Sequence, residues 1–180
     1  IKYMFYLSII LSLLYLIRND TLIFIIIFSL FVVVSTTKSR VKISLLLFIS
    51  LFATIIIFHI FRYNYYGDLF PNTYYLKITG VTLMERMERG FTVFGKYIIK
   101  YYKAIFIINL MFLYYILKNA YKSSNIILLY LLLGSSFCYS IYVGGDAWEW
   151  MAYSNRYLTV VTVPSILILI ISLMIMDQKL

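Results

Sequence analysis

A short polar and aromatic segment at residues 144–157 holds the residue types best suited to chemistry in this chain. It lies between two long apolar runs and reads Gly-Gly-Asp-Ala-Trp-Glu-Trp-Met-Ala-Tyr-Ser-Asn-Arg-Tyr. Asp146 could accept hydrogen bonds from hydroxyl groups, act as a general base, or bind a divalent cation. Trp148 and Trp150 offer flat faces for stacking, and Arg156 offers a planar fork that fits a phosphate group.

Two glycines open this segment. Gly144 and Gly145 would let the chain turn sharply at a helix end and bring backbone N–H groups close to a ligand. A second interpretation needs no ligand: a glycine cap followed by a belt of interfacial aromatic residues, with Arg156 on lipid headgroups. The residue types alone leave both interpretations open.

A second polar segment lies at residues 65–77 and reads Tyr-Tyr-Gly-Asp-Leu-Phe-Pro-Asn-Thr-Tyr-Tyr-Leu-Lys. Asp68, Asn72 and Lys77 are polar groups on a turn whose geometry Pro71 constrains. Asn72 could cap a helix that starts near the next residue. The alternative is a re-entry turn with its tyrosines at the level of the lipid headgroups.

Other polar residues carry less functional information. The run Glu85-Arg-Met-Glu-Arg89 is expected to form the solvated face of a helix. His59, the one histidine, is expected to be a packed interfacial residue, and Cys138, the one cysteine, a small core residue. With one of each, the chain can form no internal disulfide and no Cys/His zinc site, so we assign no metal ligand.

Composition places the chain in a membrane. Hydrophobic residues make up 63% and charged residues 13%, and the mean hydropathy is +0.92, whereas a soluble domain is about 25% charged. The apolar runs lie near residues 3–17, 22–34, 43–61, 104–117, 126–143 and 158–176. These runs approach or reach the roughly 20 residues that cross the hydrocarbon as a helix, and they are continuous rather than alternating. We predict an all-α, polytopic bundle of about six spans, forming a single transmembrane domain over residues 1–180.

Basic residues predict the orientation. The cluster at residues 38–42 precedes the span near 43–61 and is expected in the cytoplasm. Alternation then places residues 62–90 and 144–157 outside, on the same membrane face. Residues 81–102 are amphipathic and are predicted to form one or two helices in the outer interface.

The net charge of +9 is consistent with anionic lipid or phosphate-bearing ligands at the span ends, and we expect no nucleic-acid partner. The chain opens on Ile1 rather than Met, and its first apolar run is already under way at Tyr3. We therefore expect it to be part of a longer protein.

The two polar segments together resemble motifs of a known family. Tyr-Tyr-Gly-Asp-x-x-Pro-Asn-Thr-Tyr-Tyr-x-Lys at residues 65–77 is followed about 70 residues later by Tyr-Val-Gly-Gly-Asp-x-x and then Arg-Tyr-Leu, within residues 142–158. This pair is similar to motifs of the GT-C polytopic membrane glycosyltransferases, closest to the terminal β-(1→2)-arabinofuranosyltransferase-like family of actinobacterial cell walls and its relatives. The motifs cover about a sixth of the chain.

The resemblance implies a multi-pass enzyme of the bacterial inner membrane. Such an enzyme would take a sugar from a polyprenyl-phosphate donor to a glycan, lipid or protein acceptor on the extracytoplasmic side. It implies acidic catalytic residues at Asp146 and Asp68. The substrate-binding residues would be Asn72, Lys77, Gly144, Gly145, Trp148, Trp150 and Arg156.

Two departures from the family pattern limit the inference. The family's principal catalytic acids follow its first span, and nothing here matches that loop, so we expect this stretch alone to be inactive. After Gly-Gly-Asp the chain has Ala-Trp-Glu-Trp-Met where the family usually has a different sequence, which leaves the sugar and the need for a divalent cation open.

Two other classes of function fit the same composition: a subunit of a transporter or flippase, and a non-catalytic assembly partner in envelope biogenesis. A transporter would need ionisable residues within its spans. The predicted spans carry almost none beyond His59, which argues against that class.

Overall fold

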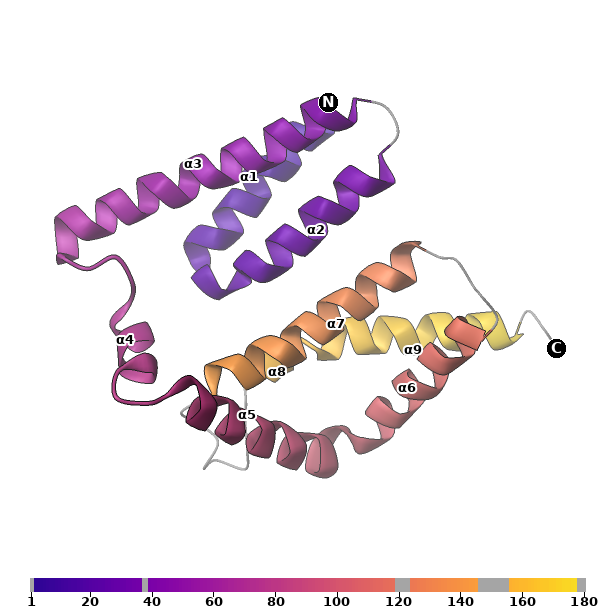
Figure 1. The fold of residues 1–180 in the computed structure, drawn as a ribbon. Coiled ribbons are helices and arrows are strands. Elements are labelled where there is room, and N and C mark those ends of the chain that lie inside the picture. The colour runs from indigo at the N-terminus through magenta and orange to yellow at the C-terminus, as the bar shows by residue number, and fades with distance from the viewer. Residues whose placement is uncertain (1, 37–38, 119–123, 146–155, 178–180) are drawn as a thin grey trace. The chain divides into compact units, whose positions relative to one another are not determined.

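The computed structural model describes residues 2–36, 39–118, 124–145 and 156–177, and throughout these ranges the regular elements are helices (Figure 1). The predicted all-α class is confirmed. The chain divides into two compact units, Ile1–Thr79 and Gly80–Leu180, and each is described by itself. One transmembrane domain spanning both units stays a prediction.

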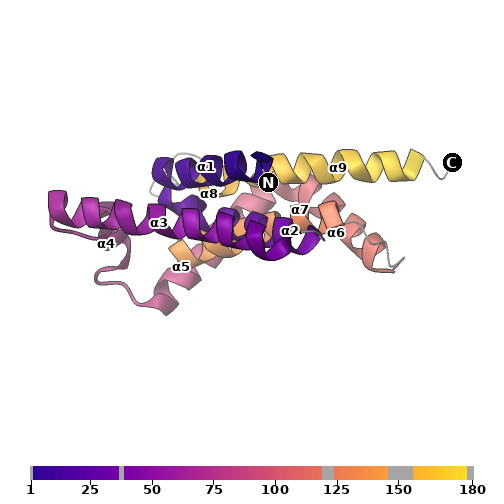
Figure 2. The same cartoon turned by 90° about the horizontal axis from the view of Figure 1, so that it is seen from above.

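The first unit consists of three long helices and a short one. Its elements are α1 (Lys2–Ile17), the 3-10 turn η1 (Asn19–Thr21), α2 (Leu22–Ser35), α3 (Arg40–Tyr66) and α4 (Asn72–Ile78). The helices α1, α2 and α3 run side by side, as Figure 1 and Figure 2 both show. Buried residues of α3 such as Ile43, Leu47 and Leu51 recur every four residues, because that spacing keeps side chains on one helix face.

The second unit begins at a helix cap. Thr82 Oγ1 accepts the backbone N–H of Glu85 at 3.3 Å, and the Glu85 carboxylate accepts the Thr82 N–H at 2.8 Å. This capping box satisfies two donors that a helix start would otherwise leave free. The elements that follow are α5 (Leu83–Tyr97), the π-helical turn η2 (Ile98–Tyr102), α6 (Lys103–Lys118), α7 (Ser124–Val143), α8 (Arg156–Thr159) and α9 (Thr162–Asp177).

The elements α5, η2 and α6 form one continuous helix of 36 residues. At 1.5 Å per residue it is about 54 Å long, well beyond the roughly 30 Å of hydrocarbon. Its axis changes direction between α5 and α6 (Figure 1), where the π-helical turn lies. The predicted amphipathic stretch at residues 81–102 is thus helical from Leu83 onward, and its interfacial position stays a prediction.

In both units serines are buried between the helices, and large apolar side chains face outward. Of the eight buried polar or charged residues in the described part of the chain, six are serines: Ser8, Ser29, Ser136, Ser140, Ser165 and Ser172. Large apolar side chains such as Ile57 (67% exposed) and Leu117 (71%) face outward on many helices. Small residues between helices let the backbones approach closely, as in membrane proteins, where packing rather than water drives association.

Within the described ranges, four helices are long and apolar enough to cross a membrane: Arg40–Tyr66, Leu83–Lys118, Ser124–Val143 and Tyr157–Ile175. The helices Lys2–Ile17 and Asn19–Ser35 are apolar but shorter. By these criteria the chain is a membrane protein, while six crossings stay a prediction.

Two details differ from expectation. A turn at residues 160–161 divides the last run, and Cys138, predicted in the core, is exposed on α7 because it lies off that helix's buried face.

The backbones of α5 and α7 touch at Gly90. A Cβ atom at this position would lie 2.2 Å from the carbonyl oxygen of Ile141 and 2.8 Å from its Cα. Ser140, beside Ile141, is fully buried. The two helices therefore depend on a residue without a side chain at this crossing.

Replacing Gly90 with alanine tests this contact. Gly90→Ala should lower the free energy of unfolding by about 1–3 kcal/mol, because the new methyl group must displace backbone. Gly95→Ala on the same helix is the matched control, since nothing lies within 4 Å of the added Cβ, and it should be neutral or slightly stabilising. The measurement is reversible unfolding of the purified protein in detergent, and equal stability of the two variants would refute the contact.

Candidate functional site

The first predicted segment forms a turn between α3 and α4. After α3 ends at Tyr66, Gly67 adopts a φ of +76° and donates its N–H to the Tyr63 carbonyl at 3.0 Å. A positive φ suits glycine, which has no Cβ to clash with the backbone. Pro71, in an extended conformation, then leads into α4.

Two side chains of α3 hold this turn. The guanidinium of Arg62 donates to the Phe70 carbonyl at 3.1 Å, and His59 Nδ1 lies 2.9 Å from the Leu69 carbonyl. Because a carbonyl only accepts, Nδ1 carries the hydrogen, and in the neutral ring Nε2 accepts the Tyr15 hydroxyl at 3.0 Å. Both nitrogens of His59 are thus engaged, and it joins α1 to the turn as a packed residue.

The polar residues of the turn lie on its surface. Asp68 and Asn72 are exposed, so both are accessible to a ligand. The prediction that Asn72 caps α4 is wrong: Asn72 is the first residue of α4, and Pro71 occupies the cap position without a side-chain hydrogen bond. Lys77 lies in α4, and its side chain is outside the described part.

The second predicted segment begins as a glycine cap on α7. Gly144 donates its N–H to the Ile141 carbonyl and Gly145 donates to the Ser140 carbonyl, each at 3.1 Å, with φ angles of +81° and +88°. This pair of bonds is the Schellman arrangement that ends many helices. Any contact of these glycines with a ligand stays a prediction, and it would not use these two N–H groups, because the cap engages both.

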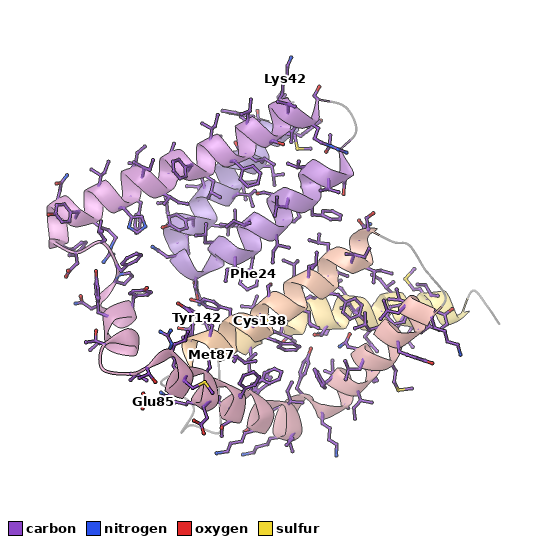
Figure 3. The ribbon with its side chains drawn as sticks, viewed as in Figure 1. Phe24, Lys42, Glu85, Met87, Cys138 and Tyr142 are labelled. Carbon is purple, nitrogen blue, oxygen red and sulfur yellow. The ribbon has the colours of Figure 1, made fainter. Side chains whose placement is uncertain are left out.

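Arg86 of α5 packs against this cap. A Cβ atom on Gly144 would lie 2.6 Å from Arg86 Cγ and 2.9 Å from the Arg86 carbonyl oxygen. The Arg86 Cζ lies 4.7 Å from the centre of the Tyr142 ring. Figure 3 shows Tyr142 at the end of α7 beside the start of α5, where Glu85 and Met87 are labelled. The end of α7 and the start of α5 therefore meet.

The expected solvated face includes Glu85, Glu88 and Arg89, which are exposed, but not Arg86, which is only 8% exposed. The sequence feature that could have predicted the burial of Arg86 is its spacing from Gly90. Arg86 lies four residues before Gly90, and that interval puts both residues on the face that packs against α7. The charges around Arg86 concealed this pattern.

The remaining predicted residues lie at or beyond the edge of the described part. Asp146, Trp148 and Trp150 are outside it, and Arg156 begins α8 with its side chain outside it. Within the described ranges no three His, Cys, Asp or Glu residues gather into a metal-binding group. The two polar segments belong to different units, so their pairing on one membrane face stays a prediction.

Comparisons of the chain with protein-family models, with curated proteins and with solved structures found no match. The resemblance to GT-C glycosyltransferases therefore rests on the two motif segments.

The contact between Gly144 and Arg86 predicts unequal effects of two glycine substitutions. Gly144→Ala and Gly67→Ala both place a methyl group at a positive φ, which costs about 1 kcal/mol. Only Gly144→Ala also meets neighbouring atoms, since nothing lies within 4 Å of a Cβ at Gly67. Gly144→Ala should therefore destabilise the protein by about 1–3 kcal/mol more. Denaturant titration in detergent measures the difference, and equal losses would argue against the packing of Arg86 on the cap.

Proposed function

We propose that this chain is part of an integral membrane glycosyltransferase. It moves a sugar from a polyprenyl-phosphate donor to an envelope glycan, lipid or protein acceptor on the extracytoplasmic face of the bacterial inner membrane. The observation that carries the proposal is the position of the two motif segments. Each contains a positive-φ glycine directly after a long apolar helix, Gly67 after α3 and Gly144 after α7.

Orientation supports placing both segments outside. Arg40 and Lys42 stand at the start of α3, and basic residues favour the cytoplasmic end of a span. The α3 helix then leads outward, the helix Leu83–Lys118 returns, and α7 leads outward again. The shorter helices α1 and α2 add two further crossings in this proposal, with flanking polar residues reaching the interface.

In this proposal the predicted site residues have separate roles in the sugar transfer. Asp146 or Asp68 takes the proton of the acceptor hydroxyl while that oxygen forms a bond to the anomeric carbon of the sugar. The bond from that carbon to the phosphate oxygen breaks, and polyprenyl phosphate leaves with the electron pair. Lys77 and Arg156 balance its charge.

The described geometry supports this division for Asp68. His59 and Arg62 hold the backbone of its turn through the Leu69 and Phe70 carbonyls, while Asp68 itself stays exposed. A fixed turn with an accessible carboxylate suits a residue that must meet a substrate hydroxyl.

Transfer by membranes that contain the gene's full-length product tests the proposal, with radiolabelled polyprenyl-phosphate arabinofuranose as the first donor. Asp146→Asn or Asp68→Asn should reduce the transfer rate by about 10²- to 10⁴-fold, the usual contribution of a general base. Glu88→Gln is the control, because this exposed carboxylate on α5 has no assigned role. Transfer at the wild-type rate by both aspartate variants would overturn the site assignment.

A further inference from the structure

Arg86 stands apart from the other charged residues of the chain. Of the charged side chains that the structure describes, it alone is buried, with 8% of its surface exposed. It lies in the first turns of α5, at the end of the second unit where α7 finishes. A cation removed from water is costly unless an anion or several acceptors surround it.

The described neighbours of Arg86 supply no such partner. Its Nε atom is buried without a hydrogen-bond acceptor. The adjacent carboxylate of Glu85 is engaged elsewhere, since it accepts the N–H and the hydroxyl of Thr82 at 2.8 and 2.9 Å. Arg18 and Asp20 form an ion pair within 4 Å, but they belong to the other unit.

The surroundings hold the guanidinium in place without neutralising it. The ring of Tyr142 lies against it, with 4.7 Å from Cζ to the ring centre. Gly144 leaves room for the aliphatic stem, because any side chain there would meet Arg86 Cγ. A cation–π contact offsets part of the cost of burial, but it leaves the buried Nε without an acceptor. The arrangement is a fixed cation that still requires an anion.

We propose that Arg86 binds the phosphate group of a membrane lipid at the junction of α5 and α7. A guanidinium offers two parallel N–H groups that match two phosphate oxygens, which an ammonium group cannot do. A lipid suits the position because α7, which ends at this junction, exposes apolar side chains such as Ile127 and Leu131 and is long and apolar enough to cross a membrane. The inference rests on the proposed function, in which the lipid is the polyprenyl-phosphate donor or product. It adds Arg86 as a phosphate-binding residue that the sequence had not indicated.

Binding measurements on the full-length product in phosphatidylcholine nanodiscs test this site. The probes are polyprenyl phosphate, phosphatidylglycerol and inorganic phosphate, each titrated separately with the thermal unfolding midpoint as readout. Polyprenyl phosphate should raise the midpoint of the wild type. Arg86→Lys, which keeps the charge but loses the fork, and Arg86→Met should each weaken the apparent affinity by about 10- to 100-fold, as expected for charge-assisted hydrogen bonds. Lys103→Gln is the control, because it removes an exposed charge from the same unit and should leave the affinity unchanged.

Stability without ligand distinguishes a lipid phosphate from an internal carboxylate. If the guanidinium of Arg86 has no anionic partner until the lipid binds, ligand-free Arg86→Met should unfold at the same or a higher temperature than the ligand-free wild type, because the substitution removes an unpaired buried charge. A fall in the ligand-free midpoint with unchanged lipid affinity would mean that a carboxylate such as Asp146 or Glu149 pairs with Arg86. That result would overturn the inference.

The separate probes also distinguish this inference from the proposed function. Arg86-dependent binding of phosphatidylglycerol, with no binding of polyprenyl phosphate, would keep the phosphate site and contradict the glycosyltransferase proposal. Equal binding of polyprenyl phosphate by the wild type and both Arg86 variants would refute the site and leave the glycosyltransferase proposal standing. Binding of inorganic phosphate alone would contradict a lipid ligand.

Discussion

The hydrocarbon layer of a membrane imposes the constraint on which the rest of this structure depends, because it accepts apolar side chains and excludes charges and free backbone groups. The chain satisfies this constraint with helices that expose aliphatic and aromatic side chains. The contacts between these helices are lined by small residues such as Ser136, Ser140 and Ser165. In the described part of the chain, charged side chains lie near the helix ends, in the turns between helices, and along α5 and η2.

The junction of α5 and α7 shows how close packing places a charge at such an end. Gly90 lets the two backbones touch, and Gly144 lets the stem of Arg86 pass beside the end of α7. The glycine cap turns the chain away from the helix at the same point, toward the segment that carries Asp146. One local arrangement thus ends a helix, buries a guanidinium and starts the second of the two polar segments on which the resemblance to glycosyltransferase motifs rests.

Sequence reasoning could locate the helices because continuous apolar runs are a local signal. It could also anticipate the glycine cap, since two successive glycines after an apolar run are typical of a helix end. It could not find the bond between Tyr15 and His59, which joins residues 44 positions apart and depends on how α1 packs on α3. It also predicted Arg86 on a solvated helix face, because the neighbouring charged residues were given more weight than the four-residue spacing to Gly90. Only the packing of α5 against α7 decides between the two patterns.

The central claim is that the polar turns after α3 and α7 open on the extracytoplasmic side of a membrane. Labelling of single cysteines with a membrane-impermeant maleimide tests the side on which α3 ends, and the alternation of spans then gives the side on which α7 ends. The labelling uses a Cys138→Ser background in right-side-out and inverted vesicles. The account predicts that Asp68→Cys and Val81→Cys, both at exposed positions, are labelled in right-side-out vesicles. Val41→Cys and Leu117→Cys should be labelled only in inverted vesicles. Labelling of position 68 or 81 from the cytoplasmic side alone would contradict the account.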